Sequence, residues 1–289
     1  MIKKVRKAVI PAAGFGTRFL PATKSIPKEM FPIIDKPVIH YAVEEAIKAG
    51  ITEIVFITGR GKRAIEDYFD HAYELEDQLK KSGKNELLKQ VEDISDLANI
   101  SYIRQKEPLG LGHAVLRAKE LIGDEPFAII LPDMLVDSDV PYMKQVMDAY
   151  EKTEKSVIGF KETTREKVSS YGIADPAEEG DLFKLRGVVE KPSPEEAPSN
   201  LYIFGRYIMT PEIFKYLEQT KPGKNGEIQL TDAIQQIIKT DGAYGVKLIG
   251  EDYDTGEKIG FVKATVAFAM KNERFSVELT EFFKSLKEN

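Results

Sequence analysis

Residues 9–33, VIPAAGFGTRFLPATKSIPKEMFPI, place glycines and cations together on one proline-rich segment. Gly14 and Gly16 follow a short apolar run, and glycines at such a point let backbone amides approach an anion closely. Arg18 and Lys28 follow on the same segment, whose prolines predict a stiff, extended loop. We therefore expect a preformed cationic clamp for a polyphosphate.

The familiar phosphate-binding fingerprints do not match this loop. A dinucleotide turn of the G-x-G-x-x-G type requires a third glycine where Phe19 stands, and the P-loop pattern is missing both here and at residues 59–63. The two glycines alone are equally compatible with a tight turn. The prediction of a phosphate site depends on their combination with Arg18 and Lys28.

A second polar segment, RQKEPLGLGHAV at residues 104–115, lies between an expected strand and an expected helix. Gln105 carries both a donor and an acceptor, which suits the edge of a nucleobase. Gly110 permits close backbone approach near the start of the helix, where the helix dipole favours acceptor groups. An ordinary strand–turn–helix is the alternative, and we expect no chemical role for His113.

Charged residues also end two further predicted strands. Asp133 follows the apolar run of residues 127–131, and Mg²⁺ is commonly held by one or two carboxylates together with substrate phosphates. The alternative is that Asp133 caps the following turn. Glu190 and Lys191 precede Pro192, and they can face one site only if the strand ends there, as the proline favours. Their alternative is a surface ion pair worth about 0–1 kcal/mol.

The elements that must position these residues alternate along the first half of the chain. Short β-branched runs followed by helical patterns predict a doubly wound α/β sheet with buried parallel strands. The expected strands are residues 5–10, 53–58, 100–104, 127–131 and 156–160, and the expected helices are 38–49, 112–122 and 139–152.

Later segments add mixed strands and helices to the same domain, which we expect to span residues 1–289. A helical insertion is expected at about 62–97, broken near Ser82 and Gly83, as solvated decoration, a lid or a subunit contact. The later expected strands are 172–175, 182–190 and 200–208; the later helices are 211–218, 229–239 and a C-terminal helix within 265–289.

Composition limits the possible partners and compartments. The 289 residues carry a formal net charge of -6, so the chain has no general attraction for nucleic acid and phosphate recognition must be local. The absence of cysteine excludes disulfides and thiol catalysis and fits the reducing cytoplasm. With 3 histidines, a multi-histidine metal centre is not expected. No run approaches the about 20 apolar residues that span a membrane, and the N-terminus favours a strand over a signal peptide.

The chain resembles the sugar-1-phosphate nucleotidylyltransferase family, and the uridylyltransferase branch in particular. The family pattern G-x-G-T-R followed by P-K is present at Gly14, Gly16, Thr17, Arg18, Pro27 and Lys28. The resemblance continues through RQKEPLGLGHAV, LPDM, VVEKP, GEIQLTDAI and YDTGEKIGFVKA and so covers essentially the whole chain. It implies a Rossmann-like doubly wound mixed sheet of the nucleotide-diphospho-sugar transferase type, with a sugar-binding part at about 165–264.

The resemblance also implies roles for individual residues. Arg18 and Lys28 would bind a triphosphate and Lys191 the sugar phosphate, as the catalytic groups. The implied nucleotide contacts are Ala12, Ala13, Gly14, Gly16, Thr17, Glu29, Gln105, Gly110 and Asp133. The implied sugar contacts are Gly172, Glu190 and Lys191. The implied Mg²⁺ ligands are Asp133 and, as in relatives with a D-T-G motif, Asp254.

The implied reaction converts UTP and glucose 1-phosphate into UDP-glucose and pyrophosphate by Mg²⁺-assisted in-line attack on the α-phosphate. The alternatives are a thymidylyltransferase for the same sugar phosphate and a non-catalytic nucleotide-sensing subunit on the same fold. Because the family is commonly dimeric or tetrameric, we expect a homodimer or homotetramer with contacts through residues 65–97 or the C-terminal helix. We expect no nucleic-acid or membrane partner.

Overall fold

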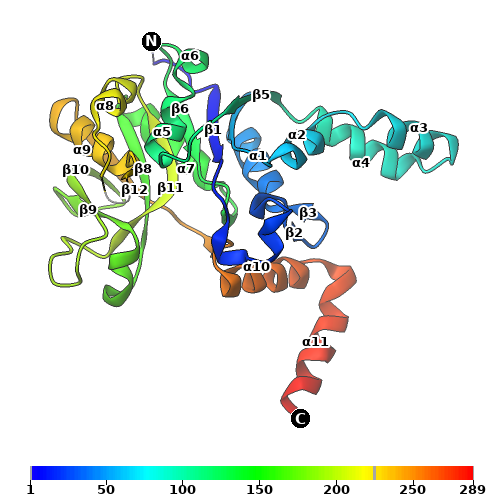
Figure 1. Ribbon diagram of the computed structural model, residues 1–289. Helices are drawn as coiled ribbons and strands as arrows, with labels where there is room; N and C mark the ends of the chain where they lie inside the picture. The colour runs from blue at the N-terminus through cyan, green and yellow to red at the C-terminus, as the bar shows by residue number, and fades with distance from the viewer. Residues whose placement is uncertain (1, 224–225, 289) are drawn as a thin grey trace.

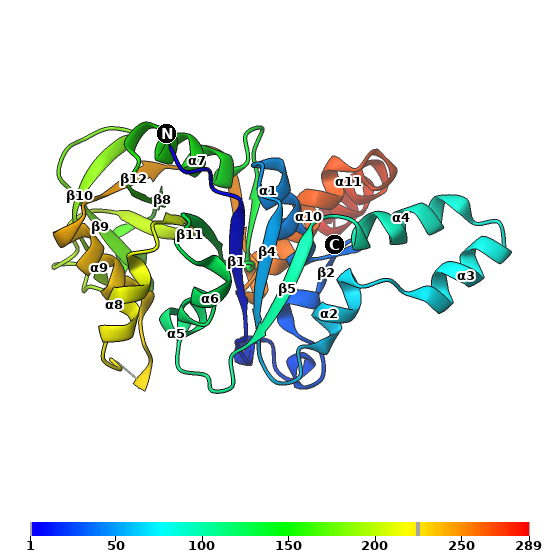
Figure 2. The same ribbon diagram turned by 90° about the horizontal axis from the view of Figure 1, so that it is seen from above.

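The computed structural model describes residues 2–223 and 226–288. Its centre is a nine-stranded mixed sheet in the order β5-β4-β1-β6-β11-β8-β12-β10-β9 (Figures 1 and 2). The strands of this sheet are β1 (Lys7–Ala12), β4 (Glu53–Thr58), β5 (Asn99–Arg104), β6 (Phe127–Ile130), β8 (Ser156–Glu162), β9 (Gly172–Pro176), β10 (Leu182–Glu190), β11 (Leu201–Met209) and β12 (Ala243–Lys247). This architecture confirms the predicted α/β fold with mixed strands added late.

Four neighbouring strands, β5, β4, β1 and β6, run parallel to one another. The sequences of β4, β1 and β6 are apolar over consecutive positions because both faces of the sheet are covered there, and β1 completely buries Ala8, Val9 and Ile10. The four strands therefore end at the same edge, where ligands bind in open α/β sheets. Strand β11 runs antiparallel between β6 and β8 and joins the two halves of the sheet.

Helices cover both faces of this sheet (Figure 2). On one face α1 and α7 bury Ile39 and Val146 against strand residues such as Ile10. On the other face α5 and α9 bury Val115 and Ile234. The helices of these layers are α1 (Val38–Lys48), α5 (Leu111–Leu116), α6 (Lys119–Ile122), α7 (Tyr142–Thr153), α8 (Ile213–Gln219) and α9 (Leu230–Thr240). The helix predicted at 112–122 is thus two helices, α5 and α6.

The proline-rich segment after β1 is not extended, contrary to the prediction. It folds into three short 3₁₀ turns, η1 (Thr17–Phe19), η2 (Ala22–Lys24) and η3 (Lys28–Met30), and then into the short strand pair β2 (Pro32–Ile33) and β3 (Lys36–Pro37). Proline fixes its own φ near −65°, a value that 3₁₀ turns share with extended chain. Composition alone therefore could not distinguish the two conformations.

The helical insertion forms three helices; the first packs against the core through Ile65 and Phe69, and the other two project from the body of the molecule (Figures 1 and 2). The three helices are α2 (Arg63–Phe69), α3 (Tyr73–Lys81) and α4 (Asn85–Ser95), and the chain turns between α3 and α4 at Ser82 and Gly83, as predicted. Leu75 and Leu87 are exposed on this arm. We call α3 and α4 the helical arm below.

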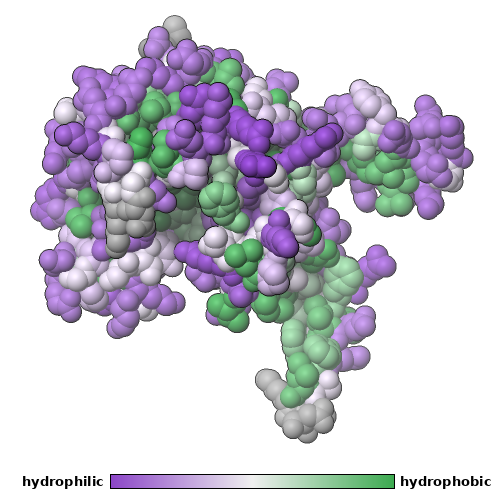
Figure 3. All heavy atoms as spheres, viewed as in Figure 1, coloured by the Kyte–Doolittle hydropathy of each residue, from purple (hydrophilic) through white to green (hydrophobic). Residues whose placement is uncertain are grey.

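The C-terminal segment forms two helices, not the single helix predicted from residue 265. Helix α10 (Lys258–Lys271) ends at Asn272, whose backbone is extended, and α11 (Glu273–Glu288) then leaves the body at an angle (Figure 1). Val277, Phe282 and Leu286 are exposed on α11, and apolar surface is visible along it in Figure 3. Among the described residues, no helix combines the length and apolarity needed to cross a bilayer.

Candidate active site

A pocket of about 480 Å³ opens where β1 and β6 end, at the edge predicted to bind ligand. Segments from the loop after β1, the turn before α5 and the turn after β6 form its walls. Of the residues predicted to bind nucleotide, those that line it are Ala13, Gly14, Gly16, Thr17, Lys28, Glu29, Gln105, Gly110 and Asp133. Ala12 lies instead in the core, with 1% of its surface exposed.

The loop after β1 is held by its own backbone and by Thr23. Gly16 has a φ of 64°, in the left-handed region that favours glycine, and its carbonyl accepts a hydrogen bond from Thr23 Oγ1 at 2.8 Å. A Cβ at Gly16 would come within 3.3 Å of the Cβ of Lys28. The compact turns thus bring Lys28 back over the glycines, which an extended loop would not do.

The turn before α5 fixes the predicted base-reading side chain. Gln105 is buried, and its Nε2 donates to Gly110 O at 3.1 Å and lies 2.9 Å from His113 Nδ1. With both amide hydrogens used, Oε1 remains as the acceptor of Gln105. Gly110 has a φ of 94°, and a Cβ there would lie 2.8 Å from the Cβ of Glu227. No larger residue fits at Gly110.

Lys28 and Asp133 form an ion pair at the floor of the pocket, with 2.6 Å between Nζ and Oδ2. Burial alone would raise the pKa of Asp133, but the charge and hydrogen bond of Lys28 outweigh it, so the pKa of Asp133 lies below its usual value. Burial would lower the pKa of Lys28, yet the charges of Asp133 and Glu29 raise it. The two groups are therefore held ionised as carboxylate and ammonium.

Asp254 lies beside Asp133 because of a strand pair that the sequence did not predict. Strands β7 (Met134–Asp137) and β13 (Glu251–Asp254) are antiparallel, and their register places Asp254 opposite Met134. Thr255 donates to Asp133 O through both its backbone N and its Oγ1, each at 2.8 Å. Burial, followed by the charge of Asp133, raises the pKa of Asp254.

The space between the two carboxylates fits a divalent cation. A Cβ added at Gly256 would lie 2.9 Å from Asp254 Oδ1 and 3.2 Å from Asp133 Oδ2, so both oxygens converge on one point that only glycine leaves open. Arg18 Nη1 approaches the same point to 3.6 Å and pairs with Glu257 at 3.2 Å. In the described part of the chain no cluster of three or more acidic, histidine or cysteine side chains could hold a metal, so substrate oxygens would complete the coordination.

The predicted sugar-binding residues lie together on the outer strands β9 and β10. Strand β10 ends at Glu190, as Pro192 predicted, and Lys191 takes a left-handed φ of 48°. Glu190 Oε2 accepts a hydrogen bond from Thr231 Oγ1 at 2.7 Å, and Lys191 Nζ lies 3.4 Å from Glu190 Oε1. A Cβ at Gly172 would lie 2.8 Å from Ile203 Cδ1 and 3.3 Å from Glu190 Oε2.

Two tyrosines near the predicted sugar-binding residues have raised pKa values, mainly because they are buried. Tyr207 of β11 is buried, which raises its pKa, and the negative charges of Glu190 and Asp133 raise it further. Tyr171, next to Gly172, likewise has its pKa raised by burial and by the charge of Asp254.

Several polar residues of this region escaped the sequence analysis. Glu29 was predicted to contact nucleotide, but its carboxylate forms a buried ion pair with Lys62, at 2.7 Å. Lys62, Thr231, Thr255 and the buried Arg206 were not singled out. Each contacts a residue that is distant in sequence, so its role follows from the fold and not from its sequence neighbours.

Residues 7–271 match the family described as nucleotidyl transferase. The chain belongs to this nucleotidyl transferase family. A UTP–glucose-1-phosphate uridylyltransferase from Bacillus subtilis is 53% identical to it over 286 residues, which cover 99% of this chain and 98% of that protein. The family membership confirms the resemblance read from the loop after β1.

Solved structures agree with this membership of the nucleotidyl transferase family. A UDP-glucose pyrophosphorylase complexed with UDP-glucose is 45% identical, with a TM-score of 0.85 over 93% of this chain and 100% of that chain. A UTP-bound enzyme of the same name from Acinetobacter baumannii is 38% identical, with a TM-score of 0.91 over 98% of this chain and 100% of that chain.

Proposed function

We propose that this nucleotidyl transferase is a UTP–glucose-1-phosphate uridylyltransferase, which converts UTP and glucose 1-phosphate into UDP-glucose and pyrophosphate. The observation that carries this proposal is the full-length similarity to uridylyltransferases, at 53% identity. The pocket at the ends of β1 and β6 supports it, because it combines glycines, the ammonium of Lys28 and the carboxylate of Asp133 on facing segments.

In this reaction an oxygen of the sugar phosphate attacks the α-phosphorus of UTP. A new P–O bond forms there, the bond from the α-phosphorus to the bridging oxygen breaks, and pyrophosphate leaves with that electron pair. The attacking oxygen is already ionised, so no general base is needed. The main obstacle is repulsion between anions, about 4 kcal/mol for two unit charges about 4 Å apart at an effective dielectric near 20.

The chain's own residues offset this repulsion. Arg18 and Lys28 would bind the triphosphate of UTP, and Lys191 would bind the phosphate of glucose 1-phosphate. Lys28 must leave Asp133 to do so, and its ammonium needs to move only from one anion to another at the floor of the same pocket. Preorganised cations of this kind stabilise charge that develops in the transition state.

Asp133 and Asp254 would hold the Mg²⁺ ion. Their oxygens converge on the open point beside Gly256, and one or two carboxylates with substrate phosphates are the usual Mg²⁺ environment in proteins. When bound, Mg²⁺ neutralises charge on the phosphate oxygens of UTP. Thr255 holds the backbone of Asp133 at this point and so keeps the two carboxylates together.

Selectivity for uracil and glucose would come from the buried turns on each side. Gln105 Oε1 would accept the N3–H of uracil, with the backbone of Gly110 against the base and Ala13 and Gly14 against the nucleoside. Glu190, oriented by Thr231, would accept hydrogen bonds from sugar hydroxyls, and Gly172, whose missing side chain makes room for Ile203 and the Glu190 carboxylate, would contact the sugar through its backbone.

The apolar faces of α11 and the helical arm support a homodimer or homotetramer as the working assembly. Val277, Phe282 and Leu286 are exposed on α11, and Leu75 and Leu87 on the arm (Figure 3). Such clusters on a protein surface mark interaction sites. We place the enzyme in the cytoplasm, because a chain without cysteine suits a reducing compartment.

Release of pyrophosphate from UTP and glucose 1-phosphate in the presence of Mg²⁺ is the deciding measurement. We expect turnover that requires both substrates and the metal. A steady-state comparison of UTP with dTTP separates this activity from thymidylyltransfer. Nucleotide binding without pyrophosphate release would contradict the proposal and support a nucleotide-sensing subunit.

A further inference from the structure

The turn that carries Asp133 is held from behind by a buried arginine. Residues 131–133 connect β6 to β7, which begins at Met134, and all three line the pocket, with Asp133 as the charged one. Arg206 lies on the neighbouring strand β11, where the register places it opposite Ile130 at the end of β6. Its guanidinium is therefore next to the start of the turn, with 1% of its side chain exposed.

Arg206 contacts both ends of this turn at once. Its Nη1 donates to Leu131 O at 2.9 Å and its Nη2 donates to Met134 O at 2.7 Å. The backbone supports the same join, because Leu131 N donates to Gly205 O at 3.0 Å. Two carbonyls three residues apart are thus fixed by one planar group, and Asp133 lies between them.

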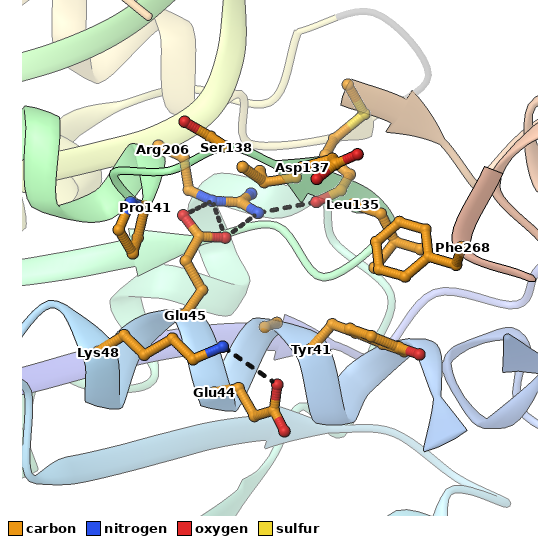
Figure 4. Close-up of a pocket in the computed structure, with 13 residues that line it drawn as sticks. Tyr41, Glu44, Glu45, Lys48, Leu135, Asp137, Ser138, Pro141, Arg206 and Phe268 are labelled. Atoms are coloured by element: carbon orange, nitrogen blue, oxygen red, sulfur yellow. Dashed lines mark hydrogen bonds and ion pairs between the residues drawn. The ribbon is translucent and has the colours of Figure 1, made fainter. Parts of the chain in front are cut away.

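Glu45 of α1 fixes the guanidinium in turn. Arg206 Nε and Nη2 both donate to its carboxylate, with the shortest distance 2.7 Å (Figure 4). Met143 N at the start of α7 donates to Glu45 Oε1 at 2.9 Å. The second hydrogen of Nη1 reaches Gly205 O at 3.3 Å. All five N–H groups of Arg206 therefore have acceptors.

We propose that Arg206 is a positioning residue for the metal site: by clamping the carbonyls of Leu131 and Met134 it sets the direction of the Asp133 carboxylate. Arginine suits this task because its donors form a rigid fork, whereas a lysine ammonium is a point charge on a flexible stem. The inference rests on the proposed function, since it concerns the cation that Asp133 would hold.

The test separates positioning from simple support of the fold. Arg206→Lys keeps a cation opposite Glu45 but cannot span both carbonyls. We expect Mn²⁺ binding to the enzyme–UTP complex, measured by electron paramagnetic resonance, to weaken about 10–100-fold, as is typical when a group that orients a metal ligand is lost. The Mg²⁺ concentration for half-maximal pyrophosphate release rises in parallel, while UTP binding in EDTA stays close to wild type.

A matched control is Ile51→Ala. Ile51 is buried just before the amino end of β4, whereas the pocket lies at the carboxyl ends of the parallel strands, so this change leaves a cavity in the core far from the pocket. It lowers the melting temperature without touching the turn, and we expect its Mn²⁺ binding to remain normal. If Arg206→Lys loses melting temperature like this control and still binds Mn²⁺ like wild type, the positioning role is wrong.

A second variant applies if Arg206→Lys does not fold. The double change Glu45→Gln, Arg206→Met removes both buried charges, so it folds more readily than Arg206→Met alone. Weak Mn²⁺ binding by this folded double variant supports the clamp, and wild-type Mn²⁺ binding overturns it. Failure of the proposed function has a different signature, because the wild-type chain itself would then release no pyrophosphate.

Discussion

Lys28 and Glu29 are neighbours in the sequence, yet their two ion pairs are built for different purposes. Lys28 meets Asp133 at 2.6 Å with side chains 22% and 29% exposed, whereas Glu29 meets Lys62 at 2.7 Å with side chains 1% and 7% exposed. The contact distances are almost equal. The difference lies in access: Glu29 also borders the pocket, but its pair with Lys62 is almost completely buried, whereas the Lys28–Asp133 pair is partly open.

This difference determines in which pair a ligand can replace one of the two partners. A phosphate or a metal ion can replace one partner of the open Lys28–Asp133 pair without leaving a bare charge. The closed Glu29–Lys62 pair has no such substitute, and breaking a buried pair leaves a costly uncompensated charge. We therefore expect changes at the open pair to alter activity and changes at the closed pair to alter stability.

Asp133→Asn tests the open pair most severely. We expect magnesium-dependent pyrophosphate release to fall to background, because a neutral amide cannot neutralise a divalent cation as a carboxylate does. The melting temperature should change little, since the position is half-exposed and the side chain keeps its size. A variant with a full Mg²⁺ response would place the metal elsewhere.

Lys28→Ala tests the cationic half of the same pair. We expect kcat to fall about 10²–10³-fold, the usual loss for one preorganised donor in a transition state. Lys24→Ala is the matched control, because Lys24 is an exposed lysine on the same loop and should leave kcat near wild type. Near-normal turnover of Lys28→Ala would exclude its assigned role.

Lys62→Met tests the closed pair. We expect the free energy of unfolding to fall by about 3–5 kcal/mol, because Glu29 is left charged and buried without a partner. Chemical denaturation measures this loss, and adding Glu29→Gln should restore much of it. If Lys62→Met instead left stability intact and lowered kcat as Lys28→Ala does, the distinction between the two pairs would fail.

Lowering the pH should have the smallest effect on metal binding and on folding stability, and it should act through the carboxyl group of Asp254. Its pKa in the folded chain is raised by burial and by Asp133, so Asp254 takes up a proton at a higher pH than an ordinary carboxyl. Its contribution to folding stability is therefore present at low pH and lost as the pH rises through that folded-state value. Metal affinity follows the opposite course and weakens first at Asp254 as the pH falls.

Titration of Mn²⁺ binding from neutral to mildly acidic pH checks this order. The pKa of Asp133 is lowered, so it stays ionised when Asp254 is already protonated. Asp254→Asn should bind Mn²⁺ more weakly at neutral pH. It should also lose the fall in Mn²⁺ affinity that protonation of Asp254 causes in the wild-type enzyme. A variant that kept this fall would assign it to another group.

The sequence predicted the parts of the site that depend on local order. The strand at 53–58 matches β4 at both ends, because an apolar run between turn residues identifies a buried strand. Asp133 and Gln105 were found because each follows such a strand. The glycines and cations of the loop after β1 were found because they are close in the chain.

Residues that depend on distant pairing could not be found in this way. Asp254 was named only through the family resemblance, because it reaches Asp133 through the β7–β13 pair; Arg206, which reaches the same turn through the register of β11, was not named. Lys62 looked like a surface lysine, since nothing local shows that Glu29 is buried beside it. The conformation of the proline-rich loop was wrong for a related reason: its turns are closed by contacts such as Thr23 to Gly16.

The order of strands also separates the two specificities along the sheet. Gln105 and Asp133 follow β5 and β6, whereas Gly172 and Glu190 belong to β9 and β10 at the opposite edge. An engineer could therefore replace the acceptor sugar by redesigning the outer hairpin and leave the nucleotide donor untouched. Strand β11 is the boundary of that exchange, because it pairs with β6 on one side and with β8 on the other.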